Sequence, residues 1–180
     1  MKTSASYLEK VYPLRAGASY VIRAILPTDK ERIIGLFNHL SPESRYLRFA
    51  HAISKLPDDF LEDVLDLDYQ KEMALVAVIQ TDDGQEEIIG IARYVTPSGQ
   101  SACEFSLSVS DDFGALGIGT HLMQELISYA KSNQLSEMLG YVLSANHKML
   151  QLVTELGFQI ENMESDSEFN IVKLSLSSRS

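Results

Sequence analysis

The sequence predicts an α/β (α+β) fold in a single domain, in which one sheet is built from strands that alternate with helices. Three strand-like runs follow one another between residues 73 and 109, and the turn signals Asp82-Asp-Gly84 and Pro97-Ser-Gly99 separate them. A glycine-rich turn then leads directly into an amphipathic helix, and further strand and helix patterns follow it. At 180 residues the chain is long enough to bury one core, and no stretch of it reads as a linker between two domains.

The first part of the chain is predicted to be one strand followed by three helices. Alternation over residues 20–26 predicts the strand, and Thr28-Asp-Lys-Glu31 has the form of a capping box that opens a helix. Ser41-Pro42 predicts a second helix with Ser41 as its N-cap, and a third helix is expected after Pro57.

The later part of the chain is predicted to alternate strands with two helices. After the strands of residues 73–109, further strands are expected at 138–143, from 158 onward and at 169–176. Gly157 is placed to end the helix that Asn146 opens. The helix after the glycine turn is expected to bury one apolar face, formed by Ile118, Leu122, Met123, Leu126, Ile127 and Ala130.

The two ends of the chain show no strong pattern. Residues 1–17 have no clear periodicity, so we expect a loosely docked, flexible lead-in before a domain at 18–176 and a frayed tail at 177–180. Neither an apolar signal core nor a long apolar run is present, so the sequence predicts no membrane span and a cytoplasmic location.

Charge and cysteine content exclude several classes of function. A formal net charge of −10 argues against binding nucleic acid and favours basic partners. The single Cys103 rules out an intramolecular disulfide, and its place in an apolar strand favours packing over catalysis. The four histidines (His39, His51, His121 and His147) show no metal-ligand spacing, so no metal site is expected.

The segment from Glu104 to Thr120 carries the strongest functional signal. An alternating strand runs through a glycine turn into a helix, so backbone amides and the helix N-terminus can hold a phosphate without a basic side chain. A dinucleotide-binding fold would place such a turn after its first strand, whereas this turn follows a three-strand meander past mid-chain. The pattern therefore indicates a nucleotide-like cofactor of another kind.

The order of elements and two motifs resemble the GNAT acetyltransferase superfamily. Gly114-Ala-Leu-Gly-Ile-Gly119 is similar to the superfamily's acetyl-CoA signature, and Asn146 and Leu156-Gly-Phe158 match a second feature. The resemblance implies a central mixed, mostly antiparallel, twisted sheet of six to seven strands flanked by helices. It also implies an N-acetyltransferase that uses acetyl-CoA as co-substrate.

Within that superfamily, residues 20–176 most resemble the acetyltransferase domain of Pat-type bacterial protein lysine acetyltransferases. The segment Leu40-Ser-Pro-Glu-Ser-Arg-Tyr-Leu-Arg-Phe49 and Glu104 carry the closer resemblance. It implies acetyl transfer to a protein lysine side chain, with Glu104 as general base. In that group a sensor or synthetase-like domain is often fused to the acetyltransferase domain, and we expect no regulation by such a domain here.

The resemblance also implies a set of cofactor-binding positions. Backbone amides of the turn would hold the pyrophosphate, Leu107 to Val109 would border the pantetheine, and Asn146 would reach the pantetheine or cap its helix. The amides are those of Gly114, Ala115, Leu116, Gly117, Ile118, Gly119 and Thr120.

Three departures from the superfamily pattern leave alternatives open. Gly114 and Leu116 replace polar or basic residues, which removes side-chain help for the phosphates, and Val153 replaces a tyrosine that protonates the leaving thiolate. The alternatives are a small-molecule amine or polyamine acceptor, and a catalytically degenerate module that senses acyl-CoA. The sequence leaves a monomer and a homodimer equally open.

Overall fold

A computed structural model describes residues 7, 9–49, 56–162 and 168–177, and places all its strands in one sheet. The sheet has eight strands in the order β1-β2-β3-β4-β5-β6-β8-β7, and only β5 and β6 are parallel neighbours. The fold is thus the mixed, mostly antiparallel sheet that the sequence predicted. The strands are β1 (Lys10–Pro13), β2 (Ser19–Ala24), β3 (Glu72–Gln80), β4 (Glu86–Val95), β5 (Ala102–Val109), β6 (Glu137–Leu143), β7 (Gln159–Asn162) and β8 (Phe169–Ser175).

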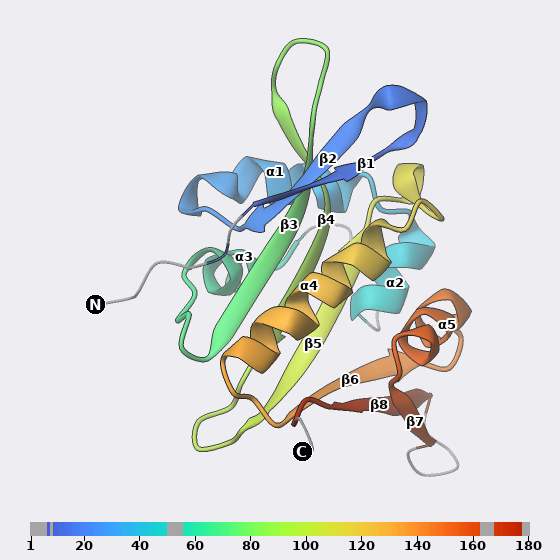
Figure 1. The fold of residues 1–180 in the computed structure, drawn as a ribbon. Coiled ribbons are helices and arrows are strands. Elements are labelled where there is room, and N and C mark those ends of the chain that lie inside the picture. The colour runs from blue at the N-terminus through green and yellow to red at the C-terminus, as the bar shows by residue number, and fades with distance from the viewer. Residues whose placement is uncertain (1–6, 8, 50–55, 163–167, 178–180) are drawn as a thin grey trace.

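Helices cover both faces of the sheet (Figure 1). Helix α4 packs on β3, β4 and β5 from one side, while α1 packs on β4 and α2 on β5. Each face has its own buried apolar cluster, because side chains alternate along each strand. The α-helices are α1 (Lys30–Asn38), α2 (Pro42–Phe49), α3 (Asp58–Leu65), α4 (Ile118–Ser132) and α5 (His147–Glu155).

The N-terminal segment differs from the predicted flexible lead-in. Lys10–Pro13 forms the edge strand β1, antiparallel to β2, so the sheet has one strand more than the sequence suggested. Its anchor is Glu125 on α4, which accepts hydrogen bonds from Tyr7 Oη (3.0 Å) and Tyr12 Oη (2.6 Å) and from Lys10 Nζ (2.9 Å). Four residues ending in a proline are too few to show a period, and Glu125 lies more than a hundred positions away.

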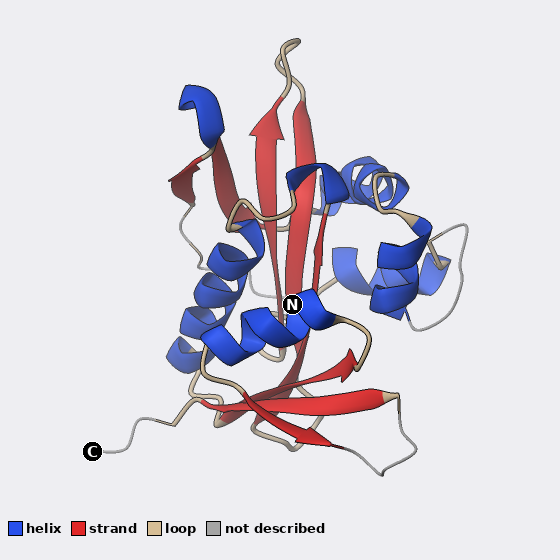
Figure 2. Cartoon of the chain, turned by 90° about the vertical axis from the view of Figure 1, so that its right-hand side faces the viewer, coloured by secondary structure: helices blue, strands red, loops and turns tan. Residues whose placement is uncertain are grey.

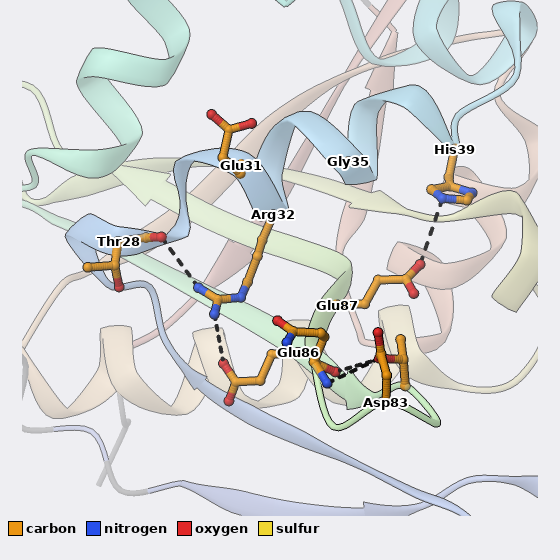
Figure 3. Close-up of a pocket in the computed structure, with 10 residues that line it drawn as sticks. Thr28, Glu31, Arg32, Gly35, His39, Asp83, Glu86 and Glu87 are labelled. Atoms are coloured by element: carbon orange, nitrogen blue, oxygen red, sulfur yellow. Dashed lines mark hydrogen bonds and ion pairs between the residues drawn. The ribbon is translucent and has the colours of Figure 1, made fainter.

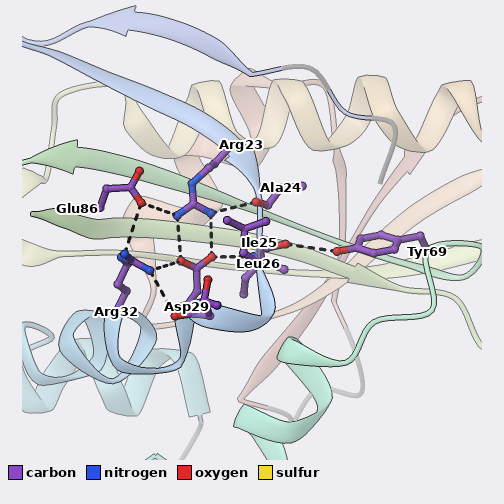
Figure 4. A network of polar contacts seen from close by, with 9 residues as sticks. Arg23, Ala24, Ile25, Leu26, Asp29, Arg32, Tyr69 and Glu86 are labelled. Atoms are coloured by element: carbon purple, nitrogen blue, oxygen red, sulfur yellow. Dashed lines mark hydrogen bonds and ion pairs between the residues drawn. The ribbon is translucent and has the colours of Figure 1, made fainter. Parts of the chain in front are cut away.

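The start of α1 is organised by Asp29, so the prediction of a Thr28 capping box is wrong (Figure 4). Asp29 is fully buried and accepts two hydrogen bonds from Arg23, at 2.8 and 2.9 Å. It also accepts the Leu26 amide at 2.7 Å, and Arg32 lies 3.1 Å from it. Burial alone would raise the pKa of Asp29, but these bonds outweigh it and hold the pKa below its usual range.

The remaining elements follow the sequence pattern. Ser41 Oγ accepts the Ser44 amide at 3.1 Å, which confirms Ser41 as the N-cap of α2. The six apolar residues predicted to form the inner face of α4 are all buried. Gly157, at φ 98°, ends α5 as predicted.

Candidate functional site

The sheet opens between its two parallel strands. β5 and β6 pair only through Ala102, Cys103 and Glu104, although β5 continues to Val109 and β6 to Leu143. In Figure 2 the strands β6 to β8 run across the direction of the upper strands, which makes the divergence visible. Beyond Glu104, the N–H and C=O groups along the facing edges of β5 and β6 therefore form no strand-to-strand hydrogen bonds within the described chain.

One residue pair marks the point where the two strands part. A Cβ atom on Gly140 of β6 would overlap the ring of Phe105 on β5, so only glycine fits opposite that ring. The Phe105 ring also meets Phe158 edge to face at 5.3 Å between centroids. The aromatic side chain thus packs against β6 at the point where the pairing of the two strands ends.

The glycine turn lies at the wide end of this opening. Gly117 is the N-cap of α4 and has φ 83°, a left-handed conformation that favours glycine. Ala115 also has positive φ, at 62°, whereas Gly114 has an ordinary extended backbone. The His121 amide donates to Gly117 O at 3.0 Å, so the amides of the three preceding helical residues come before the first closed turn and remain available. These are the amides of Ile118, Gly119 and Thr120.

Two helix N-termini converge on the same opening. β5 leads into α4 through the turn and β6 leads into α5 through Asn146, so both N-termini lie at the carboxyl ends of the parallel strands. Each N-terminus carries partial positive charge, which suits an anionic ligand, although at α5 the His147 amide is already bonded to Ala145 O. Asn146 Oδ1 accepts the Met149 amide at 3.2 Å, so its carbonyl caps α5 and its amide group remains to donate.

The third glycine of the turn has a packing role. A Cβ on Gly119 would lie 3.2 Å from Leu152 of α5 and 3.4 Å from Leu107 of β5. Gly119 thus lets α4 approach α5 and β5 closely, whereas Gly117 is needed for the left-handed backbone conformation at the N-cap. Leu107 is buried, Val109 is half-buried and Leu116 packs partly against the core.

Glu104 stands at the narrow end of the opening, on the sheet face covered by α1, α2 and α3. It is exposed, and it lies opposite Val95 of β4, while Ser106 lies opposite Arg93. Opposed residues and residues two apart share a face, so Glu104, Ser106 and Arg93 point to the same side. The Glu104 carboxylate thus lies near the start of β5, and the glycine turn follows the end of the same strand.

Side chains of the α1–α2 region hold the segment before the turn. Asp111 accepts the Ser41 amide and the Ser44 hydroxyl, both at 2.6 Å, and Asp112 lies 3.2 Å from His39 Nδ1. The sequence analysis missed this contact, because both partners are ordinary polar residues about 70 positions apart. The available signal was the acidic pair Asp111-Asp112, two residues before Gly114.

Two residues singled out in the sequence are buried away from this chemistry. Val153 is fully buried among apolar side chains. Because a valine side chain has no N–H or O–H group, this position cannot supply a proton. Cys103 is also fully buried, and burial raises the pKa of its thiol to about 12. The thiol therefore stays protonated at neutral pH, in agreement with a packing role.

A pocket of about 590 Å³ lies elsewhere, between α1 and the β3–β4 hairpin (Figure 3). Its lining includes Arg32, His39, Glu86 and Glu87, and contains none of the predicted site residues. Within the described residues, no cluster of histidine, cysteine or acidic side chains is arranged to hold a metal ion. Among the described helices, none has the length and apolar character needed to cross a membrane.

Comparisons with known proteins agree with this geometry. The model of the acetyltransferase (GNAT) family matches residues 35–158. Acetyltransferase PA5475 of Pseudomonas aeruginosa is 34% identical over 166 residues, which cover 92% of this chain and 89% of that protein.

Two solved structures share the fold. The GNAT domain of S. lividans PAT superposes with a TM-score of 0.84 at 23% identity, covering 96% of this chain and 99% of that one. The acetyltransferase yncA from Salmonella typhimurium, solved with its cofactor acetyl-CoA, gives 0.66 at 19% identity, covering 89% and 96%. The family match spans well over half of the chain, and with the relative from Pseudomonas aeruginosa it shows that this chain belongs to the acetyltransferase (GNAT) family.

Proposed function

We propose that the protein is an acetyl-CoA-dependent N-acetyltransferase that acetylates a primary amine, with Glu104 as general base and a protein lysine side chain as acceptor. One observation carries this proposal: β5 bears an exposed carboxylate where it leaves β6 and ends in a turn of free amides. A long ligand with a phosphate at one end can lie between the two strands and bring its other end to Glu104.

The residues present fit acetyl-CoA. The amides of residues 115–120 and the N-terminus of α4 would hold the pyrophosphate, and the unpaired edges of β5 and β6 would bond the amides of the pantetheine. Leu107 and Val109 would border that path, and the Asn146 side-chain amide, whose oxygen caps α5, would donate to the pantetheine. When bound, acetyl-CoA supplies the acetyl group as a thioester.

Glu104 would prepare the acceptor for attack. A lysine amine has a pKa of about 10.4, so it reaches the site as an ammonium that must lose a proton. Glu104 takes this proton, directly or through water, and the freed nitrogen lone pair forms the bond to the acetyl carbon as the carbon–sulfur bond breaks. The acylated nitrogen then gives its second surplus proton to water, which leaves a neutral amide. The sulfur leaves with the bonding electrons as a thiolate, which is tolerable because a thiol pKa is about 8.5. Water must protonate it, since Val153 cannot.

The protein lysine acceptor is supported by charge and by resemblance. The net charge of −10 favours a basic protein partner, and the Pat-type resemblance spans residues 20–176. A small amine is the second acceptor class, because the acceptor side is built by α1, α2 and the loops around them, which differ most among acetyltransferases.

A second candidate function is an acyl-CoA-binding module without turnover. Gly114 and Leu116 offer no side chain to the phosphates, and Val153 offers no proton to the thiolate. This candidate predicts tight acetyl-CoA binding and no acetyl transfer to any amine.

An acetyl-transfer assay separates these functions. Release of the CoA thiol is followed with a lysine peptide, a polyamine and free amino acids, using the unaltered protein and Glu104→Gln. We expect thiol release with at least one acceptor and its loss in Glu104→Gln. Thiol release that is equal in both proteins would exclude Glu104 as the base, and acetyl-CoA binding without release would favour the sensing module.

A further inference from the structure

Arg48, near the C-terminal end of α2, has an unusual environment for an arginine. Its guanidinium lies over the ring of Phe49 at 4.8 Å and over the ring of Phe60 at 5.5 Å, and it is half-buried. Among the described residues it makes no hydrogen bond and no ion pair. Within the described part of the chain its five N–H donors have no acceptor, while the two aromatic rings hold the side chain in place.

Arg48 shares its surroundings with the proposed base. Helix α2 packs on β5, and the charges of Arg93 and Glu104 both act on the Arg48 guanidinium. Arg93 is already paired with Glu72 at 3.2 Å, whereas Glu104 makes no side-chain hydrogen bond in the described chain. Within the described chain, a guanidinium and a carboxylate that have no other charged partner thus lie in the same region, where α2 packs on β5.

Burial removes part of the water that would otherwise solvate the Arg48 guanidinium. Burial lowers its pKa to about 10, with Arg93 adding to the decrease and Glu104 opposing it. Arg48 is still a cation at neutral pH. A partly desolvated cation is stabilised by an anion, and Glu104 loses its negative charge when it accepts the proton of the amine. A second anion would then keep Arg48 compensated.

We propose that Arg48 binds an anionic group of the acceptor, so that the preferred acceptor carries a carboxylate close to its amine. This inference rests on the proposed function, because it assigns a substrate preference to the same site. Glu104 meets the ammonium and Arg48 meets the carboxylate. In a protein the carboxylate belongs to an acidic residue beside the lysine, and in a small molecule it belongs to the same amino acid.

The proposed preference for a carboxylate applies only at the site, whereas the net charge of the whole protein favours basic partners. A net charge of −10 attracts basic proteins from a distance. At the site, however, a guanidinium is placed to form charge-assisted hydrogen bonds with a carboxylate. We therefore expect acidic residues next to the modified lysine even where the acceptor protein is basic overall.

The test compares acceptors that differ only beside the amine. Peptides of one length carry a single lysine flanked by aspartate, alanine or arginine, and free amino acids form a further arm that identifies the source of the carboxylate. We expect a KM for the aspartate-flanked peptide that is roughly tenfold or more below that for the arginine-flanked one, as for a hydrogen bond between charged groups. Equal KM values across the peptides and the amino acids would overturn the inference.

Charge reversal provides the decisive arm. Arg48→Glu should reverse the order of the aspartate- and arginine-flanked peptides, while Arg48→Lys should keep it. Arg15→Glu changes the net charge equally in the exposed connection between β1 and β2, away from the strand on which α2 packs, and should leave the order unchanged. An order that Arg48→Glu leaves unchanged would overturn the proposal.

The design separates this inference from the proposed function. Absence of transfer to every acceptor would contradict the proposed function, and calorimetric binding of the same peptides would still test Arg48. Preferential binding of the aspartate-flanked peptide that Arg48→Glu abolishes would support the inference in that case, and equal binding would overturn it.

Discussion

The ring of Phe105 on β5 occupies the space that a Cβ atom on Gly140 of β6 would need. This contact lies one residue beyond the last paired residues of the two strands, Glu104 and Leu139. The strands separate at this contact, and beyond it β5 leads toward the N-terminus of α4 and β6 toward that of α5. Glycine at position 140 is what allows the Phe105 ring to lie against β6 at this point.

Substitution of this glycine should be costly. Gly140→Ala places a methyl group against the Phe105 ring, and we expect the free energy of unfolding to fall by about 1–3 kcal/mol, as for other overpacked cores. Urea denaturation measures this change. The double variant with Phe105→Leu should recover part of the loss, because the smaller side chain leaves room, and additive effects of the two substitutions would contradict the steric account.

The turn glycines should differ in their tolerance of a side chain. Gly117→Ala forces alanine into a left-handed conformation, at a cost of about 1 kcal/mol, and should weaken binding of acetyl-CoA. Gly114→Ala is the matched control, since Gly114 has an extended backbone and a Cβ there meets only Asp111 O, at 3.7 Å. Calorimetric titration of both variants checks this, and equal affinities would show that the conformation of Gly117 is not needed.

Addition of a basic side chain at Gly114 should strengthen cofactor binding. Gly114→Arg restores a residue type found at this position in the superfamily, next to the proposed pyrophosphate site, and the position is exposed with an ordinary backbone. The expected result is a lower Kd for CoA and an unchanged affinity for acetyl-pantetheine, which has no phosphate. An equal change for both ligands would place the effect elsewhere.

Removal of Glu104 should affect the chemical step. Glu104 is exposed and makes no side-chain hydrogen bond in the described residues, so Glu104→Gln should leave the fold and the Kd for acetyl-CoA unchanged. We expect kcat to fall by about 10²–10⁴, the usual contribution of a general base. Steady-state kinetics with a saturating amine measures it, and a change confined to KM would assign Glu104 to acceptor binding.

The buried Asp29 should make stability depend on pH. Its folded-state pKa is lowered, so its contribution is fully present above the unfolded pKa of about 3.9 and is lost as pH falls through the folded value. At pH 7, Asp29→Asn should lower the free energy of unfolding by about 3 kcal/mol, because the buried Arg23 loses its bidentate carboxylate partner and keeps only the half-exposed Glu86, at 3.2 Å. Denaturation at a series of pH values should show the two proteins converging below about pH 4, and a constant difference would contradict this account.

The parts of the fold that depend on local sequence patterns could be predicted from the sequence. The six buried residues of α4, the hairpin at Gly84 and the cap Ser41 each depend on neighbours within a few positions. The glycine turn was found for the same reason.

The missed parts depend on contacts between distant residues. β1 is held by Glu125, and the segment before the turn is held by Ser41 and Ser44. Arg48 comes under the influence of the Glu104 charge only in the folded chain. Asp29 was missed because Thr28 offered a plausible local cap, while its true partner Arg23 sits on the preceding strand. A local pattern cannot show which of two neighbouring polar residues is turned inward.

Calorimetric titration of the protein with acetyl-CoA tests the central claim most directly, namely that the opening between β5 and β6 and the turn at Gly117 form the acetyl-CoA site. We predict saturable binding of one molecule per chain, and much weaker binding when Gly117 is replaced by valine, while Glu104→Gln binds as the unaltered protein does. An absence of binding to the unaltered protein, or binding that Gly117→Val leaves unchanged, would contradict the account.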